Sequence, residues 1–498
     1  MPIALTAARA PASGAGSFRG NDSALLGIVF AVVTFWLFAQ TAMNIGPLMA
    51  RDLGMPMPVM NIAISLSALF SGMFTVVLGG LGDRWGRVRI VMVGNLLGIA
   101  GSLLIAFSTG AAATPMVILG RILQGLAAGA IMPSTLALLK TYWDGRDRQR
   151  AVSMWAIGTW GGSGLAALFG GFMASTALGW RAIFILGALV SVASILLMRQ
   201  IPESAPLAGR SGRTDWAGIV SLAVGLAALL VAVTQGSTLG WGNLLTWALL
   251  AVSLAAFCVF ANAERRAPHP LVDFALFRNP VFTGATLSNL LINGTAGALA
   301  VSLWVLQGAG GLAAATAGYL TIGYAVFIIA FIRVGEKLLQ RFGPRRPMLW
   351  GSQIVLAAIV LLMATHLLQA QYVIVAAVAY SLFGLGLALY ATPSTDAALS
   401  NLPGDQAGAG SGIYKMASAL GAAFGVAISA ALFTALSAGG AQAVGAVIAF
   451  SGRQDNLAVR EAGMVALAFT ALMAIAALVA IAVLIPKQAR DATAQRDG

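Results

Sequence analysis

Charged side chains are scarce in this chain. Asp, Glu, Lys and Arg together make up 9% of its 498 residues, whereas hydrophobic residues make up 59%. A soluble globular protein carries about a quarter charged residues. The composition therefore excludes an ordinary water-soluble fold and indicates a chain whose solvent is lipid.

Cysteine and histidine are almost absent. The single cysteine, Cys258, excludes an intrachain disulfide, and the only two histidines, His269 and His366, make a metal site improbable. No nucleophile–base–acid set and no GxxxxGK[ST] phosphate loop occurs. We therefore expect no enzyme activity, no cofactor, no metal and no nucleotide-driven pumping by this chain.

Long apolar runs fill most of the chain. Fourteen segments of roughly 18 to 25 residues qualify as membrane-spanning helices. They cover 24–48, 58–80, 88–108, 114–139, 151–175, 181–198, 216–234, 243–262, 281–306, 312–334, 347–366, 372–395, 408–436 and 462–485. The first run is too long for a signal peptide, so we expect it to remain uncleaved.

The positive charges fall in alternate loops. With a cytoplasmic amino terminus, the inner segments hold twenty-two Lys and Arg residues and the outer segments hold four. The positive-inside rule then predicts that both termini are cytoplasmic. We expect a multi-pass protein of the plasma (inner) membrane. The same distribution explains the net charge of +13 without a nucleic-acid partner, which would need one contiguous basic patch.

One short loop is strongly charged. The stretch 79–89 reads GGLGDRWGRVR and follows the second apolar run, and EKLLQRFGPRR at 336–346 echoes it without the acid. The first of these stretches reproduces the G-x-L-x-D-R-x-G-R pattern of the major facilitator superfamily, which the chain resembles. The matching residues are Gly79, Asp83, Arg84, Gly86 and Arg87. The alternative is that the match has no functional meaning, because any tight turn between two spans is rich in Gly and Arg.

The resemblance implies an all-α integral membrane protein of the major facilitator fold. Superposing the loop on its echo pairs spans 1–6 with spans 9–14 and leaves spans 7 and 8 as an insert, which is the layout of the fourteen-span drug:proton antiporters. The predicted parts are an N-terminal tail (1–23), a six-helix half (24–198), a linker with two inserted helices (199–280), a second half (281–486) and a C-terminal tail (487–498).

In the resembled family the charged loop latches the two halves together on the cytoplasmic side. That role is carried over to Gly79, Asp83, Arg84, Gly86 and Arg87, and in the echo to Arg341, Gly343 and Arg345.

Span 4 carries the family's R-x-x-Q-G pattern at Arg121 and Gln124. A guanidinium in an apolar helix is costly, so Arg121 is expected to face a partner or a water-accessible vestibule, unless it snorkels to an interface. The resemblance links this arginine to proton coupling or substrate binding. In span 13, Lys415 either lines the cavity or snorkels.

Acids are missing from the interior of the spans. Span 1 offers Gln40 and Asn44 where the family commonly has an aspartate, and span 5 has Ala166 and Ala167 in place of the family's Gly-Pro. Of the sixteen acids, only Asp396 in span 12 could reach a cavity. Since a buried cationic drug favours a nearby carboxylate, the preferred cargo is predicted to be anionic, zwitterionic or neutral, with any proton coupling through Asp396.

Aromatic and amide side chains are the remaining candidates for the cargo pocket. They are Trp36, Gln40 and Asn44 on span 1, Trp155 on span 5, and Asn293 and Trp304 on span 9. For each of them, a position in the aromatic belt at the membrane interface or a hydrogen bond between helices is an equally open interpretation.

The leading hypothesis is a monomeric secondary transporter that exports lipophilic small molecules by alternating access, as in multidrug efflux, with membrane lipids around it and with proton coupling left open. The alternative within transport is a proton-independent facilitator or a translocator of lipids or anionic amphiphiles. The alternative of another class is a non-transporting membrane receptor or scaffold.

Overall fold

The computed structural model describes residues 18–143, 147, 150–151, 154–155, 157–203, 216–240, 242–267, 272, 274–367, 369–399, 407–439 and 447–487. Within these residues the secondary structure is helical, without strands. Thirteen of the described helices are long and apolar enough to cross a membrane. They match thirteen of the fourteen predicted spans. The remaining one, the fifth span at 151–175, includes residues outside the described set and is helical over Ile157–Ser175.

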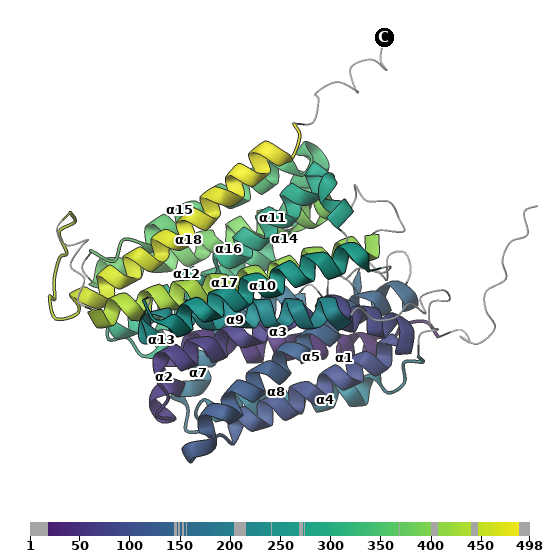
Figure 1. The fold of residues 1–498 in the computed structure, drawn as a ribbon, viewed down its shortest axis with the longest axis horizontal. Coiled ribbons are helices and arrows are strands. Elements are labelled where there is room, and N and C mark those ends of the chain that lie inside the picture. The colour runs from purple at the N-terminus through teal and green to yellow at the C-terminus, as the bar shows by residue number, and fades with distance from the viewer. Residues whose placement is uncertain are drawn as a thin grey trace, which may run out of the picture.

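The first half of the chain forms one group of helices, coloured purple to blue in Figure 1. They are α1 (Asp22–Val33), η1 (Thr34–Phe38), η2 (Ala39–Thr41), α2 (Ala42–Asp52), α3 (Met57–Trp85), α4 (Arg87–Ala106), η3 (Gly110–Ala112), α5 (Ala113–Tyr142), η4 (Ile157–Gly161), α7 (Gly162–Ser175) and α8 (Arg181–Met198).

The second half forms the other group, coloured green to yellow in Figure 1, and the two inserted helices lie between the groups. The inserted helices are α9 (Trp216–Leu239) and α10 (Leu244–Arg266), followed by η5 (Phe274–Arg278). The second half comprises α11 (Pro280–Gly294), α12 (Ala296–Gly308), α13 (Ala314–Tyr319), α14 (Ile322–Phe342), α15 (Arg345–Leu362), α16 (Gln369–Leu399), α17 (Ala407–Gly439) and α18 (Leu457–Leu484).

The bundle has two ends. The basic end holds the turn between α3 and α4 and the last residue of α18, and the opposite end holds the turn between α2 and α3 and the first residue of α18. In Figure 1 the basic end lies on the right and the opposite end on the left.

The outward faces of the bundle are apolar. On α10, Leu244 is 83% exposed, and Trp247 and Leu254 are also exposed. A continuous face of this kind would aggregate in water. It fits a bilayer, where the backbone polar groups are satisfied within each helix and the side chains dissolve in lipid.

Several spans are interrupted near their middle. Span 1 changes from α-helix to a π-helical turn at Thr34–Phe38 and then to a 3-10 turn at Ala39–Thr41. Span 5 has a second π-helical turn at Ile157–Gly161. Such turns take backbone groups out of the regular α-helical hydrogen-bond ladder and occur often at functional sites.

The last span begins earlier than predicted. Helix α18 starts at Leu457 rather than 462, so Arg460, which we had expected outside the helix, lies in its first turn and is buried. The Arg460 guanidinium donates to Thr365 O at 2.7 Å and to Leu367 O at 2.9 Å. These carbonyls compensate the buried charge, which allows the helix to extend past it.

Candidate functional site

Polar side chains join the two halves at the end of the bundle that lies opposite the basic end. Asn44 of α2 is fully buried there. Gln307 of α12 reaches it from the second half, where its Nε2 donates to Asn44 Oδ1 at 3.0 Å and to Asn44 O at 3.2 Å. Asn44 Nδ2 donates to Ala167 O of α7 at 2.7 Å and to Ala314 O of α13 at 3.3 Å. Asn44 thus holds together elements from both halves.

Two more hydrogen bonds cross between the halves. Trp304 Nε1 of α12 donates to Met43 O of α2 at 2.9 Å. Asn61 Nδ2 of α3 donates to Thr434 Oγ1 of α17 at 3.0 Å. Together with the Asn44 contacts they form what we call the polar seam, defined by Asn44, Asn61, Trp304, Gln307 and Thr434. Since none of these side chains is charged, each bond contributes about 1 kcal/mol net and can be broken singly.

Glycines let the backbones touch beside the polar seam. A Cβ atom added to Gly171 of α7 would lie 2.3 Å from Ala314 O, and one added to Gly318 of α13 would lie 2.6 Å from Ala167 O. No side chain fits at these distances. The close approach of α7 and α13 therefore depends on both glycines.

Arg121 of α5 lies deep in the first half and is 1% exposed. Its guanidinium makes five hydrogen bonds, to Ala39 O (2.7 Å), Gln124 Oε1 (2.9 Å), Ser67 Oγ (2.6 Å), Ile64 O (3.1 Å) and Ala63 O (3.2 Å). The expectation of a water-accessible vestibule around Arg121 is wrong for this conformation. The side chain instead ties span 4 to spans 1 and 2, because three backbone carbonyls and the side chains of Ser67 and Gln124 together accept from all five of its N–H donors.

The irregular turns explain part of this arrangement. Ala39 lies where the π-helical turn of span 1 gives way to the 3-10 turn, and its carbonyl accepts from Arg121. Trp36 and Gln40, two predicted pocket residues, are partly buried in the same interrupted segment. Trp155 of span 5 is buried and donates to Thr135 Oγ1 of α5 at 3.0 Å, so its indole joins spans 4 and 5.

The candidates in the second half are held in a separate network. Asn293 Nδ2 donates to Asn289 Oδ1 at 2.8 Å, and Asn289 Nδ2 donates to Tyr414 O at 2.9 Å. Lys415, the next residue of α17, is partly buried and lies 5.9 Å from the Tyr414 ring centroid. Asp396 is partly buried near the end of α16 at the basic end.

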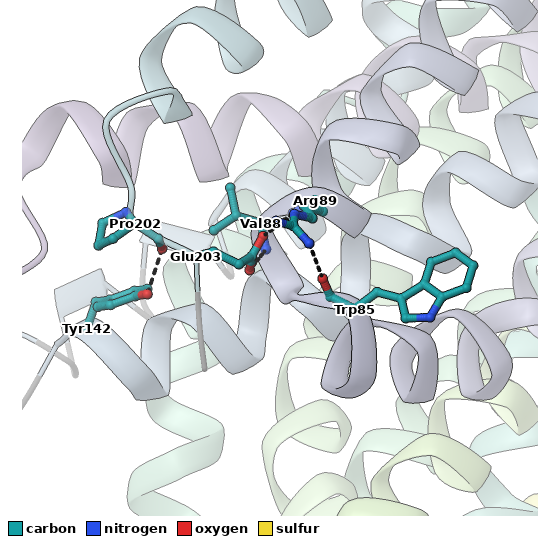
Figure 2. A network of polar contacts seen from close by, with 6 residues as sticks. All are labelled: Trp85, Val88, Arg89, Tyr142, Pro202 and Glu203. Atoms are coloured by element: carbon teal, nitrogen blue, oxygen red, sulfur yellow. Dashed lines mark hydrogen bonds and ion pairs between the residues drawn. The ribbon is translucent and has the colours of Figure 1, made fainter. Parts of the chain in front are cut away.

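At the basic end the α3–α4 turn is held by Glu203, a residue that no sequence motif indicated. Glu203, which follows α8, accepts hydrogen bonds from Val88 N at 3.0 Å and Arg89 N at 2.9 Å, as Figure 2 shows. Its carboxylate therefore caps the positive end of α4. Gly86 has φ +111°, and a Cβ atom there would lie 2.3 Å from the Glu203 carboxyl carbon. Only glycine permits this approach.

Tyr142 adds a second tie to the same segment. Its hydroxyl donates to Pro202 O at 2.7 Å (Figure 2). Burial, and secondarily the negative charge of Glu203, raises the pKa of Tyr142 above its ordinary value of 10. The phenol therefore keeps its proton, and with it this hydrogen bond, throughout the physiological pH range.

The other predicted latch residues are distributed over both halves. Arg87 Nη1 donates to Thr141 Oγ1 at 2.9 Å, and Arg345 Nη2 donates to Ala482 O at 2.7 Å. A Cβ at Gly79 would lie 3.2 Å from Pro133, and Gly343 ends α14 with φ +67°. Arg341 lies over the Phe342 ring. The side chains of Asp83 and Arg84 lie outside the described part of the chain, so the latch stays a prediction.

Comparison with known proteins gives the family. The model of the Major Facilitator Superfamily matches residues 25–426. The chain belongs to this superfamily. It is 44% identical over 472 residues to the quinolone resistance protein NorB of Staphylococcus aureus strains MRSA252 and COL, covering 95% of this chain and 97% of each relative.

Solved structures agree on the fold. An auto-inhibited POT family peptide transporter superposes with a TM-score of 0.64 at 17% identity, covering 95% of this chain and 99% of the other. A D-xylose-proton symporter superposes with a TM-score of 0.62 at 15% identity, covering 93% and 97%. Together with the family model and the NorB relatives, they confirm the predictions of a helical, multi-pass major facilitator transporter that is not an enzyme.

In the structure the predicted site residues lie in separate places rather than in one pocket. Asn44 and Trp304 meet at the polar seam, whereas Arg121 and Gln124 lie together inside the first half. Gln307 and Glu203 were missed. Gln307 had a usable signal, since an amide near the end of an apolar run needs a partner, but Glu203 sits in an ordinary polar linker and carried none.

Proposed function

We propose that this chain is a secondary active transporter of the plasma (inner) membrane that exports lipophilic small molecules by alternating access. The name of the 44% identical relative, a quinolone resistance protein, supports a drug-like cargo. The excess of Lys and Arg in alternate loops supports an orientation with the basic end and both termini in the cytoplasm. We further propose that the monomer is the working unit.

The observation that carries this proposal is the polar seam. Asn44, Gln307 and Trp304 connect the halves at the opposite end. In the proposed orientation this end faces outward, so the contacts close the exit. Because they are neutral hydrogen bonds, rocking of the halves can break them at modest cost and release the cargo outside.

The experiment that tests this cycle uses the single native cysteine, Cys258, which is first replaced by serine. Asn44→Cys and Gln307→Cys are then introduced together and joined in proteoliposomes by a short, reducible bis-methanethiosulfonate cross-linker, because the two positions meet through the end of the Gln307 side chain and lie too far apart for a direct disulfide. Cross-linking is expected to abolish efflux, and reduction is expected to restore it. Ser108→Cys with Arg181→Cys is the matched control, because Arg181 donates to Ser108 O within one half at the same end. Full transport by the cross-linked Asn44–Gln307 protein would contradict the proposal.

The proposed cargo is anionic, zwitterionic or neutral rather than cationic. In the described spans the acids lie near helix ends, as Asp396 and Glu336 do, whereas the cations Arg121 and Lys415 lie within α5 and α17. All five donors of Arg121 are already bonded to protein groups. Lys415 is therefore the proposed contact for a cargo carboxylate.

A proteoliposome flux panel tests the cargo class. Cationic, neutral and anionic amphiphiles of similar size are compared, with and without a proton gradient. Tighter binding of quaternary ammonium dyes than of the matched neutral or anionic compounds would overturn the proposed preference. Absence of flux for every compound would favour the receptor or scaffold alternative.

Proton coupling, if the flux panel reveals it, is assigned to Asp396. Efflux by Asp396→Asn is expected to lose its response to an imposed pH gradient while keeping downhill movement of cargo. Unchanged coupling in this variant would refute the assignment, and gradient-independent flux by the unmodified protein would favour the facilitator alternative.

A further inference from the structure

An apolar groove lies on the bundle surface next to the α3–α4 turn. Its cavity volume is about 560 Å³, within the range of small-ligand sites. Nine of its ten lining residues are apolar, among them Leu78 and Leu81 from α3, Met92 and Leu97 from α4, and Ala130 from α5. On the same stretch of α4, Val93 is 47% exposed, so the groove opens toward the surroundings of the bundle.

The tenth lining residue is a cation at the mouth of the groove. The Arg89 side chain is 75% exposed. Its Nη1 donates to Trp85 O at 3.4 Å, and its Nε lies 3.9 Å from Glu203 (Figure 2). Both contacts are long, and the Glu203 oxygens already accept from Val88 N and Arg89 N. Most of the hydrogen-bonding capacity of the guanidinium is therefore open to a further anion.

Trp85 indicates that the mouth of the groove lies at the level of the lipid headgroups. Its side chain lines the groove and is 63% exposed. Exposed tryptophans of membrane proteins gather at the level of the lipid headgroups. An apolar groove that runs into the bundle surface below such a tryptophan, with an arginine beside it, matches both ends of a phospholipid.

We propose that this groove binds one anionic phospholipid, with an acyl chain between α3 and α4 and the phosphate on Arg89. Basic pockets between spans on the cytoplasmic side attract acidic headgroups. The proposal uses the orientation proposed above, but it does not depend on the cargo or on transport.

The bound lipid would also act on the turn itself. Leu81, Trp85 and Val88 line the groove and belong to the charged segment 79–89 that is predicted to latch the halves. An acyl chain against these side chains would stabilise the α3–α4 turn. Anionic lipid is therefore expected to raise the transport rate.

Lipid binding is measured directly on the full purified chain, without any transport. The protein is exchanged into detergent with an equimolar mixture of phosphatidylglycerol and phosphatidylcholine, and the retained lipid is counted by native mass spectrometry. Phosphatidylglycerol is expected to be enriched on the unmodified protein, and Arg89→Gln is expected to lower that enrichment about fivefold, the loss of one surface cation. Arg89→Lys should retain most of it.

Two variants separate the groove from general surface charge. Val93→Trp would fill the groove and is expected to displace the lipid while Arg89 is intact. Arg346→Gln, which removes an exposed cation over Phe342 in the other half, is the control and should bind as the unmodified protein does. Glycerol 3-phosphate in excess should not compete, because it lacks the acyl chain.

Three outcomes would overturn the proposal. They are equal retention of the two lipids by the unmodified protein, equal loss in Arg346→Gln and Arg89→Gln, and unchanged retention in Val93→Trp. Displacement of the lipid by a transported drug would instead assign the groove to the cargo. A protein that binds the lipid but transports nothing would leave the site standing and refute the proposed function.

Discussion

A single arginine holds the helices of the first half together. Arg121 bonds carbonyls of spans 1 and 2 and the side chains of Ser67 and Gln124. The R-x-x-Q-G pattern predicted that Arg121 and Gln124 act together, but it could not predict the backbone partners, because a carbonyl such as Ala39 O has no sequence signature.

Replacing Arg121 tests this structural interpretation. Arg121→Ala leaves three buried carbonyls without their donor, at about 1–3 kcal/mol each before relaxation, and is expected to lower the melting temperature in detergent together with the yield of folded protein. Arg121→Lys keeps a charge with fewer donors and should lose less. A variant Arg121→Ala that is as stable as the unmodified protein, with transport alone impaired, would instead assign Arg121 to the cargo or the proton.

Gly86 is the position where the α3–α4 turn lies against the Glu203 carboxylate. Gly86→Ala forces a Cβ into the Glu203 carboxylate at a φ of +111°, at a cost of about 1–3 kcal/mol. Efflux and thermal stability are both expected to fall. Gly80→Ala is the matched control in the same segment, since a Cβ there meets nothing within 4 Å. Equal behaviour of the two variants would show that the α3–α4 turn tolerates loss of the Glu203 cap.

At the scale of helices, the contact between α7 and α13 depends on small residues. Gly171→Leu would drive a side chain into Ala314 O, so the two helices are expected to separate and the opposite end to open. Maleimide labelling of Gln307→Cys from outside should rise, and efflux should fall about tenfold if about 1.4 kcal/mol is lost from the closed state. Gly308→Leu, where a Cβ is 3.5 Å from Val459, is the control.

The helices themselves were largely predictable, but their interruptions were not. Hydropathy located thirteen spans that the described residues contain, because a bilayer demands long apolar runs. The π-helical turns at Thr34–Phe38 and Ile157–Gly161 leave no mark in hydropathy, since they depend on partners from other helices. Span 14 was predicted to start too late because Arg460 looked like a loop residue.

At the scale of the whole molecule, charge distinguishes the cargo classes. Lys415→Ala is expected to reduce efflux of an arylcarboxylate about tenfold or more, the loss of one charge-assisted contact, and to leave a neutral amphiphile of similar size almost unaffected. Parallel initial rates for the two compounds provide the measurement. An equal reduction for both would make Lys415 a structural residue, and no reduction would remove it from the site.

The charged loop and its echo predict a two-half arrangement with an inserted pair, whereas no local pattern predicts the conformation. Whether Asn44 lines a pocket or bonds Gln307 depends on how the halves are tilted, and the same sequence must allow both tilts in a transport cycle. For that reason the sequence proposed Asn44 and Trp304 as pocket residues and missed Gln307, their neighbour in the closed state.

The inserted helices give the molecule two unequal flanks. On one flank, Leu226 and Leu230 of α9 pack into an apolar cluster with Leu69 of α3 and Met416 of α17, and so cover the line along which those two helices of opposite halves meet. We expect α9 in this position to block the entry of a bilayer-dissolved compound between α3 and α17. Entry from the membrane is therefore expected on the other flank, where α7 contacts α14, so that the inserted pair would restrict access to one side of the molecule.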